Sequence, residues 1–394
     1  MQYTGQMRRT DLLAVELQLA HHPIFADPDR IIARRRETYY LYLEALAFED
    51  AKGPWGSILK WPTVLLDRFV DTPAARSILN EWFRAKKCTN GLSFATFLAR
   101  KPRLKSFSDW VRADCETIAV DLSMGKHVSG LDSWRGITYF DPARLPNWIV
   151  ERTRSVYMDE IGGDLGHADS DVAQPSPQAE AKIWWAIQAL SSNLPILTRS
   201  LFQHVSQVAW IPESRGREAF DGASSDSLPG VIFGMPRSSA SPWSYVEIIF
   251  HEACHQKMFD VIATNAIYRP GYSSDTAARL TAPWRREKSG CPAKWHIDRA
   301  LLAAHVYVYL AYLTCRILAN PDPWDGFDVD SFSGHTCSLF RARYLVENLI
   351  ALNSADIACR GIDLLKWLRE TLTMIEGIGF SIGLENEMPS LKQI

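Results

Sequence analysis

The feature that most constrains the fold is a long, almost unbroken apolar segment in the C-terminal part of the chain. Residues 300–319 read ALLAAHVYVYLAYLTCRILA, in which His305 and Arg316 are the only basic side chains. Such a segment either crosses a membrane or forms the central helix of a large core. The two basic residues and the lack of membrane-type flanks favour the core helix, so the chain must fold around it.

The composition agrees with a globular protein that has a large core. Of the 394 residues, 47% are hydrophobic and 22% are charged, which are ordinary values for such proteins. The 43 basic and 45 acidic residues nearly cancel, and the basic run 34–36 has acids nearby. Nucleic-acid binders usually carry a basic excess on one face. We therefore expect no nucleic-acid partner and interpret the basic runs as solvated helix faces.

The N-terminal residues and the cysteines indicate the compartment. No apolar stretch followed by a small-residue cleavage site stands at the start of the chain, so we expect a cytoplasmic protein that spans no membrane. The seven cysteines form no CxxC pair. This pattern indicates reduced thiols rather than a disulfide framework or a cysteine zinc site.

Helical periodicity dominates the chain and predicts a mainly α (α+β) fold, helix-rich with a small β element. Helices are predicted over residues 10–21, 29–50, 72–87, 92–113, 179–193, 243–266, 298–319, 336–352 and 356–375, and short strands over 208–212 and 231–235. Loops are predicted over residues 158–178 and 268–295. We divide the chain into a helical N-terminal region, residues 1–157, and a catalytic domain, residues 178–394.

The segment VEIIFHEACHQKMFDVI contains an HExxH motif, His251 to His255. On a helix the two imidazoles share one face and can bind one metal ion, with Glu252 beside them. Burying these groups without a metal would be costly in so apolar a segment. We predict that His251 and His255 are metal ligands and that Glu252 is catalytic. Glu252 is a general base in a hydrolase, and a ligand or an acceptor that orients a histidine in an oxygenase.

The motif needs a third ligand. The extended HExxHxxGxxH form is absent, because Met258 and Val261 stand at its glycine and histidine positions. In the other zinc-peptidase class the third ligand is a glutamate on a following helix. The acidic residues that could take this place here are Glu287 and Asp298, and neither lies in a suitable helical pattern. His305, inside the apolar helix, is therefore predicted as the third ligand.

At this point several segments together resemble a family, the HExxH-type peptide beta-hydroxylases. The resemblance rests on the order of five segments between residue 179 and the C-terminus: PGVIFGM (229–235), IIFHEACH (248–255), APWRR (282–286), AAHVYVYLAYL (303–313) and RARYLVENL (341–349). It implies an iron(II)- and 2-oxoglutarate-dependent dioxygenase that uses O2 to hydroxylate an aliphatic carbon, preferably the beta carbon, of an amino-acid residue. The substrate would be a peptide or another amino-acid derivative in natural-product biosynthesis. A long connection after APWRR leaves His296 open as an alternative to His305.

The resemblance also implies residues that bind the cosubstrate. Three protein ligands leave octahedral iron three positions for 2-oxoglutarate and O2. The distal carboxylate of 2-oxoglutarate needs a cation, preferably an arginine. Arg285 in APWRR is the first candidate and Arg343 the second, and the reserves are Arg279, Arg286 and Arg341.

Two other functional classes stay open: a zinc-dependent HExxH metallopeptidase or related hydrolase, and a binding protein with a structural metal. The N-terminal region is a candidate for leader-peptide or carrier-protein recognition or for homodimer formation. Cys254 is interpreted as a packing residue. The remaining histidines are interpreted as surface or capping residues: His21, His22, His127, His167, His204 and His335.

Overall fold

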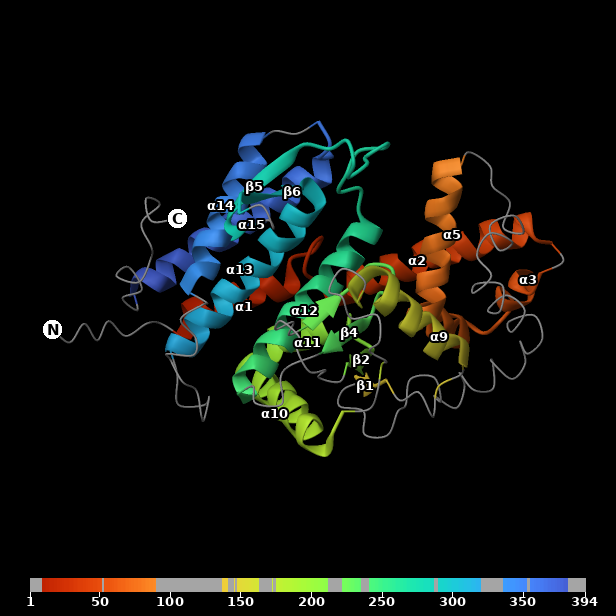
Figure 1. Ribbon diagram of the computed structural model, residues 1–394, viewed down its shortest axis with the longest axis horizontal. Coiled ribbons are helices and arrows are strands. Elements are labelled where there is room, and N and C mark those ends of the chain that lie inside the picture. The colour runs from red at the N-terminus through yellow and green to blue at the C-terminus, as the bar shows by residue number, and fades with distance from the viewer. Residues whose placement is uncertain are drawn as a thin grey trace. The chain divides into compact units, whose positions relative to one another are not determined.

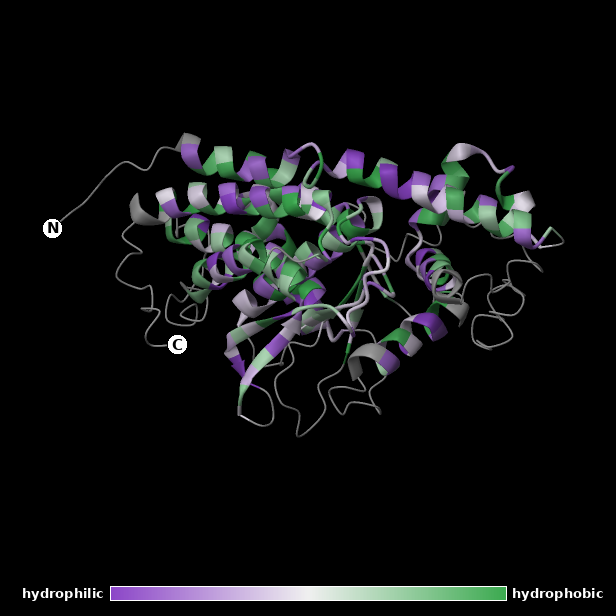
Figure 2. Ribbon diagram, turned by 90° about the horizontal axis from the view of Figure 1, so that it is seen from above, coloured by the Kyte–Doolittle hydropathy of each residue, from purple (hydrophilic) through white to green (hydrophobic). Residues whose placement is uncertain are grey.

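The computed structural model confirms the predicted fold class. It describes residues 9–51, 53–89, 137–140, 145, 147–162, 172, 175–211, 222–234, 241–286, 290–319, 336–352 and 355–381. Within these ranges the fold is α+β and mainly α, 69% helical, with twelve α-helices and two small sheets (Figure 1). Hydrophobic and hydrophilic residues alternate along the helices (Figure 2), as amphipathic helices require.

The chain packs into two compact units, each made of separate stretches of sequence. The HExxH unit comprises Pro28–Ile187 and Leu201–Asp260, and the α13 unit comprises Met1–Asp27, Gln188–Ser200 and Val261–Ile394. Three helices, α10 (Pro177–Asn193), α11 (Pro195–Phe202) and α12 (Pro242–Thr264), have residues in both units. These units are groupings by packing, and the division into residues 1–157 and 178–394 stays a prediction.

In the HExxH unit, helices and a four-stranded sheet share one hydrophobic core. The helices are α2 (Pro28–Glu49), α3 (Trp55–Ile58), α4 (Thr63–Asp71), α5 (Pro73–Thr89) and α9 (Asn147–Val156), and a π-helix, Tyr157–Gly162, follows. The strands β1 (Thr138–Tyr139), β2 (Gln207–Trp210), β3 (Gly222–Ser224) and β4 (Val231–Gly234) lie in the order β1-β2-β4-β3. β1, β2 and β4 are parallel, and β3 is antiparallel to β4. β2 and β4 are buried along their whole length, as inner strands of a covered sheet are.

In the α13 unit, one apolar helix forms the centre. α13 (Ile297–Ala319) packs against α1 (Arg9–His21), α14 (Thr336–Leu352) and α15 (Cys359–Ser381). The Tyr309 hydroxyl donates to the Leu19 carbonyl oxygen at 2.8 Å, and the Tyr312 hydroxyl donates to that of Leu12 at 3.0 Å. Among the described helices α13 alone is long and apolar enough to cross a membrane, but 72% of its apolar window is buried. The prediction of a buried core helix is confirmed.

The side chain of Glu16 joins α1 to the start of α11 (Pro195–Phe202). Its Oε1 accepts hydrogen bonds from the backbone N–H groups of Ile196 and Leu197, both at 3.1 Å. These donors lie in the first turn of α11, where they have no partner within the helix. A buried carboxylate thus caps a helix that begins 179 residues later in the chain.

One predicted loop, residues 158–178, begins inside the π-helix Tyr157–Gly162, and a larger difference from the predictions lies between residues 268 and 295. The loop predicted there contains an antiparallel hairpin of β5 (Arg279–Arg286) and β6 (Pro292–His296). Its pairing is irregular between Ala282 and Arg286, and Pro283, which has no N–H, lies in this irregular part. The proline and the interrupted alternation explain why sequence periodicity missed the strand. The predicted helix over 92–113 lies outside the described residues.

Candidate metal centre

The HExxH motif lies in the middle of α12, as predicted. The helix begins at Pro242, a residue suited to the first helical position because it has no N–H to leave unpaired. Along the central turns, His251, His255 and Phe259 are partly exposed, whereas Glu252 and the other residues between 252 and 260 are buried. Residues four apart share a helix face. α12 therefore presents one open face, and this face carries both histidines.

The two imidazoles of the motif converge. The Nε2 atoms of His251 and His255 are 3.2 Å apart, and the ring centroids are 4.9 Å apart. Two ligand nitrogens about 2.1 Å from one ion lie about 3.0 Å apart in octahedral geometry and about 3.4 Å apart in tetrahedral geometry. The His255 ring also stacks on Phe259, with centroids 6.0 Å apart. The separation of the nitrogens fits two neighbouring ligands of a single metal ion.

Glu252 is the buried carboxylate of the motif. Its Oε1 lies 4.0 Å from Nε2 of His251, and its buried Oε2 has no hydrogen-bond partner among the described residues. Burial raises the pKa of this carboxyl group, and the nearby His251 and Ser224 oppose the shift. A buried carboxylate oxygen without a partner is costly, and a cation held by the adjacent imidazoles would lower that cost.

Strand β3 passes close to Glu252 through a glycine. A Cβ atom on Gly222 would lie 2.6 Å from Cγ2 of Ile248 and 3.3 Å from Cγ of Glu252. The Ser224 hydroxyl lies 3.5 Å from the main-chain oxygen of Glu252. Only glycine permits this approach, so Gly222 helps to set where the Glu252 side chain lies.

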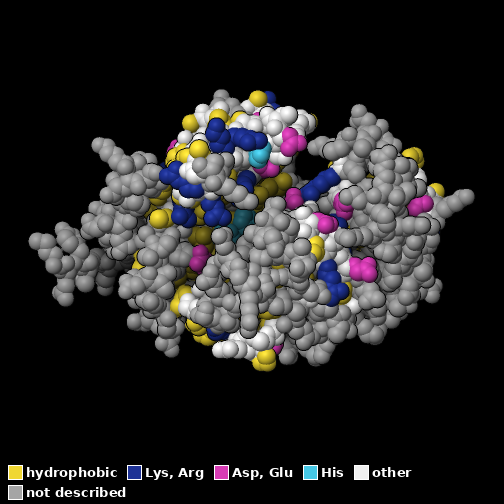
Figure 3. All heavy atoms as spheres, in the orientation of Figure 1, with side chains coloured by type: hydrophobic (Ala, Val, Ile, Leu, Met, Phe, Trp, Pro, Cys, Tyr) yellow, Lys and Arg dark blue, Asp and Glu magenta, His cyan; other side chains and the backbone are white. Residues whose placement is uncertain are grey.

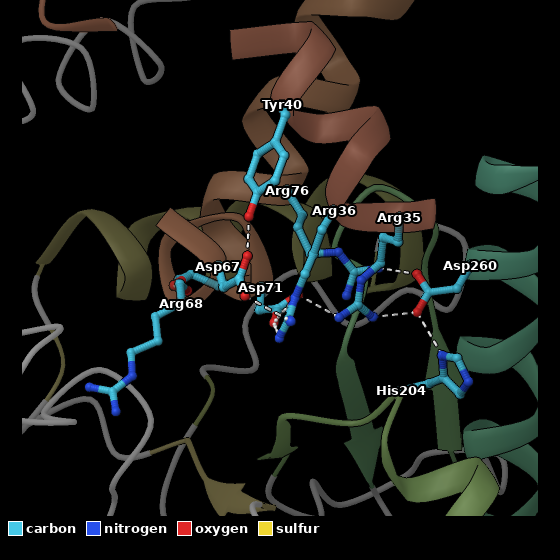
Figure 4. A network of polar contacts seen from close by, with 10 residues as sticks. Arg35, Arg36, Tyr40, Asp67, Arg68, Asp71, Arg76, His204 and Asp260 are labelled. Atoms are coloured by element: carbon cyan, nitrogen blue, oxygen red, sulfur yellow. Dashed lines mark hydrogen bonds and ion pairs between the residues drawn. The ribbon is translucent and has the colours of Figure 1, made fainter. Parts of the chain in front are cut away.

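The face of α12 opposite the histidines is held by a buried ionic network (Figure 4). Asp260 Oδ2 accepts hydrogen bonds from Arg35 Nη1 at 2.6 Å and from His204 Nδ1 at 2.7 Å. Asp260 Oδ1 accepts a hydrogen bond from Arg76. Asp260 follows His251 by nine residues, about 900° of helical rotation, which places it on the opposite side.

The network extends outward from Arg35 over α2 and α4. Arg35 Nη2 donates to Asp71 at 2.6 Å, and Arg36 donates to Asp71 at 2.6 Å and to Asp67 at 2.9 Å. Tyr40 donates to Asp67. Three arginines therefore face three aspartates, and every charge in the network has an opposite charge within hydrogen-bond distance.

The electrostatics of this network follow from the pairing. Burial alone would raise the pKa of Asp260, but Arg35, Arg76 and His204 hold it below its usual range. Burial lowers the pKa of His204 to about 4, although the Asp260 carboxylate opposes the shift. Asp260 is therefore ionised and His204 is neutral at neutral pH. His204 carries its proton on Nδ1, and this N–H donates a hydrogen bond to the Asp260 carboxylate.

Gln256 connects α12 to the sheet. Its Oε1 accepts a hydrogen bond from the Gly230 N–H at 2.6 Å, and its Nε2 donates to the Val231 carbonyl oxygen at 2.8 Å. Gly230 has φ +92°, a conformation that glycine adopts readily. The amide of Gln256 thereby fixes the start of β4 against the turn of α12 that carries His255.

The candidates for the third ligand both lie in the α13 unit. His305 is fully buried on α13, and its ring centroid lies 4.5 Å from that of Tyr309 and 6.5 Å from that of Trp367. His296 ends β6 and is half-buried. No group of three or more His, Cys, Asp or Glu residues close enough to hold a metal ion occurs within the part of the chain that the structure describes. Both assignments stay predictions.

The predicted cosubstrate arginines differ in their surroundings. Arg285 is exposed near the end of β5. Arg343 on α14 donates to Glu347 at 3.0 Å and also forms an ion pair with Glu376. A carboxylate bound by Arg343 would therefore compete with two carboxylates that it already contacts.

Sequence reasoning missed the buried network. Arg35 was expected on a solvated face and His204 at the surface, but their side chains are 4% and 0% exposed. The error arose because their partners lie far away in the sequence: Asp260 follows Arg35 by 225 residues and His204 by 56. One signal was available, since the spacing from His255 to Asp260 puts an acid on the apolar side of an otherwise hydrophobic helix.

The structure also tests the interpretations of the remaining histidines and of Cys254. His22 acts as a capping residue, because its Nδ1 accepts from the N–H groups of Ile24 and Phe25 at 3.4 and 3.3 Å. His21 is exposed, and Cys254 is buried as a packing residue, which confirms both interpretations. Four residues named in the sequence analysis lie outside the described residues: His127, His167, Glu287 and His335.

Comparison with known proteins gives no relative from which a role could be transferred: no family model and no curated protein matches this chain.

We predict that the folded protein loses stability as the pH is lowered, because His204 is buried in its neutral form. The unfolded state takes up a proton near pH 6.5, whereas the folded state takes it up only near pH 4, so folding is disfavoured progressively between these values. The expected loss is about 3 kcal/mol of unfolding free energy. Urea unfolding at several pH values would measure it. His204→Asn, which keeps a donor toward Asp260, should lose this dependence and His21→Asn should keep it. An unchanged slope in His204→Asn would contradict the assignment.

We also predict that Gly222→Ala disturbs the centre. The added methyl group must displace Ile248 or Glu252, so the variant should lose about 1–3 kcal/mol of unfolding free energy and bind divalent metal more weakly. Chemical denaturation and metal titration would measure the two effects. Gly56→Ala is the matched control, because nothing lies within 4 Å of its added Cβ. Equal behaviour of the two variants would show that the contact of β3 with α12 does not matter.

Proposed function

We propose that this chain is a mononuclear iron(II)- and 2-oxoglutarate-dependent dioxygenase that hydroxylates an aliphatic carbon of an amino-acid residue. The observation that carries the metal site is the pair of Nε2 atoms 3.2 Å apart on the open face of α12. The choice of iron and 2-oxoglutarate rests on the order of sequence segments that resembles the peptide beta-hydroxylases. The proposed substrate is a peptide or an amino-acid-derived natural-product precursor, presented on a leader peptide or carrier protein.

The donor set fits a metal ion. Imidazole nitrogens bind iron(II) and zinc alike, and the 3.2 Å separation of the Nε2 atoms lies between those of octahedral and tetrahedral neighbours. The unpartnered Oε2 of Glu252 gives a second reason to place positive charge beside the motif. His305 is the proposed third ligand and His296 its alternative.

The chain's own residues perform three tasks in this proposal. His251 and His255 hold the metal, while Asp260 and Gln256 orient the helix that carries them. Glu252, 4.0 Å from Nε2 of His251, is placed to orient that ring or to hold a proton beside the site. Arg285 and Arg343 are the proposed contacts for the distal carboxylate of 2-oxoglutarate. When bound, the iron with 2-oxoglutarate and O2 supplies the oxidising power that no protein side chain has.

A zinc-dependent HExxH hydrolase is the second candidate. It is favoured by the buried Glu252 next to the two ligands, since a glutamate at this position is the general base of HExxH peptidases. It is also favoured by β3, the antiparallel edge strand that passes Glu252, because an extended peptide can pair with the edge of a sheet. This candidate requires zinc and no O2.

The test is anaerobic reconstitution of the purified chain with iron(II), followed by 2-oxoglutarate. We expect a weak visible charge-transfer band, because the keto acid chelates ferrous iron in such enzymes. His251→Ala and His255→Ala should abolish iron binding, and His305→Ala should do the same if it is the third ligand. Replacement of the exposed His21 by Ala is the control and should leave the band unchanged.

The outcomes separate the candidate functions. Peptide cleavage with zinc and without O2, together with no band, would replace the oxygenase by the hydrolase. Loss of the band in His296→Ala but not in His305→Ala would move the third ligand to His296. Retention of iron in His251→Ala would contradict the metal site itself.

A further inference from the structure

An aromatic cluster surrounds Trp284 in the α13 unit. Its ring centroid lies 5.9 Å from that of Trp295, 6.2 Å from Tyr307, 6.4 Å from Phe340 and 5.4 Å from Tyr344. These rings come from β6, α13 and α14, and all four meet the indole nearly edge to face. The cluster therefore fixes one tryptophan between a hairpin and two helices.

Arg341 on α14 completes this cluster. Its Cζ atom lies 5.7 Å from the Trp284 ring centroid and 5.5 Å from that of Tyr307. Two aromatic faces thus hold one guanidinium group, which restricts its side chain before any ligand binds. This preorganisation lowers the entropy cost of forming a hydrogen-bonded ion pair.

The hydrogen-bonding groups of the cluster are incomplete. The Nε atom of Arg341 and the Nε1 atom of Trp284 are buried and have no hydrogen-bond partner among the described residues. Each such donor costs about 1–3 kcal/mol. Arg343, two residues along the same helix, contrasts with Arg341 because it contacts both Glu347 and Glu376.

The hairpin that carries Trp284 and Trp295 is positively charged. β5 carries Arg279, Arg285 and Arg286, β6 carries Lys294, and the described residues of both strands include no Asp or Glu. Arg299 at the start of α13 lies over the ring of Trp295, 5.2 Å from its centroid. Figure 3 shows Lys and Arg side chains gathered over the region where Figure 1 places β5 and β6. This field attracts anions toward Arg341.

The cluster lies apart from the proposed metal ligand of the same helix. Tyr307 follows His305 by two residues, which is about 200° of helical rotation. His305 packs against Tyr309 and Trp367, whereas Tyr307 packs against Trp284. Arg341 therefore contacts α13 on a different side from His305.

We propose that Arg341, held between Trp284 and Tyr307, is a second ligand site that binds a carboxylate group. The guanidinium fork matches the two oxygens of a carboxylate, and an anion would supply acceptors where Arg341 and Trp284 have buried donors. The carboxylate belongs either to a small organic acid or to an acidic side chain of a peptide. This site goes beyond the proposed metal chemistry and does not depend on it.

The test is calorimetric titration of the full, metal-free chain with glutarate and with N-acetyl-glutamate amide. Glutarate has two carboxylates but no keto group, and the amide presents a single peptide-like side chain. We expect saturable binding of at least one of them. It should weaken about tenfold or more in Arg341→Gln and less in Arg341→Lys, which keeps the charge and loses the fork. The compound that binds tighter identifies the source of the carboxylate.

Two further variants keep the test decisive. Arg360→Gln, which removes an exposed arginine paired with Asp363 on α15, is the matched control and should bind as the unaltered chain does. Trp284→Phe keeps an aromatic face and removes the indole N–H, so it should weaken binding even if Arg341→Gln fails to fold. The proposal is overturned if neither compound binds the unaltered chain. It is also overturned if Arg341→Gln and Trp284→Phe bind normally, or if Arg360→Gln loses binding equally.

Discussion

A single buried carboxylate, that of Asp260, determines how the HExxH helix sits in its unit. It accepts hydrogen bonds from two arginines and one histidine, and all four side chains are almost completely inaccessible to solvent. Removing one member of such a set leaves an uncompensated charge in the core and typically costs about 3–5 kcal/mol. The helix consequently has one orientation in which its buried acid is satisfied.

This orientation explains why the two motif histidines are partly exposed. Because Asp260 lies opposite His251 on α12, burial of the acid turns the imidazoles toward the open face. Gln256 fixes the position of the helix relative to the start of β4, and Gly222 lets β3 approach Glu252. Three contacts outside the motif thus position three residues within it. The HExxH sequence supplies the two imidazoles and the carboxylate, and the long-range contacts fix where they lie.

The sequence predicted most of what depends on local pattern. The helices over residues 10–21, 29–50 and 336–352 and the strand before the motif follow from periodicity, and the HExxH spacing alone puts both imidazoles on one face. The helices predicted over residues 72–87 and 298–319, which the structure shows as α5 and α13, are confirmed for the same reason.

What sequence reasoning missed depends on tertiary structure. The hairpin of β5 and β6 is interrupted at Pro283, so β5 does not show a full alternating pattern, and β6 is only five residues long. Arg35 and His204 were misjudged because a charged residue looks solvent-exposed until its distant partner is known. Arg341 and Arg343 lie two residues apart in the same predicted helix, and the sequence does not distinguish their surroundings. Arg341 nevertheless contacts two aromatic rings, and Arg343 contacts two glutamates. Such distinctions arise only when separate segments pack together.

We infer that the Asp260 network gives the histidine pair the geometry it needs to bind a metal ion. Cobalt(II) is a direct probe, because its visible spectrum reports the geometry of its ligands. The measurement compares cobalt affinity and spectrum in the unaltered chain, in Asp260→Asn and in the control Asp226→Asn, whose exposed acid pairs with Arg84. At a temperature where all three are folded, the account predicts that Asp260→Asn binds cobalt about tenfold more weakly with an altered spectrum, while the control is unchanged. Normal affinity and an unaltered spectrum in folded Asp260→Asn would contradict it.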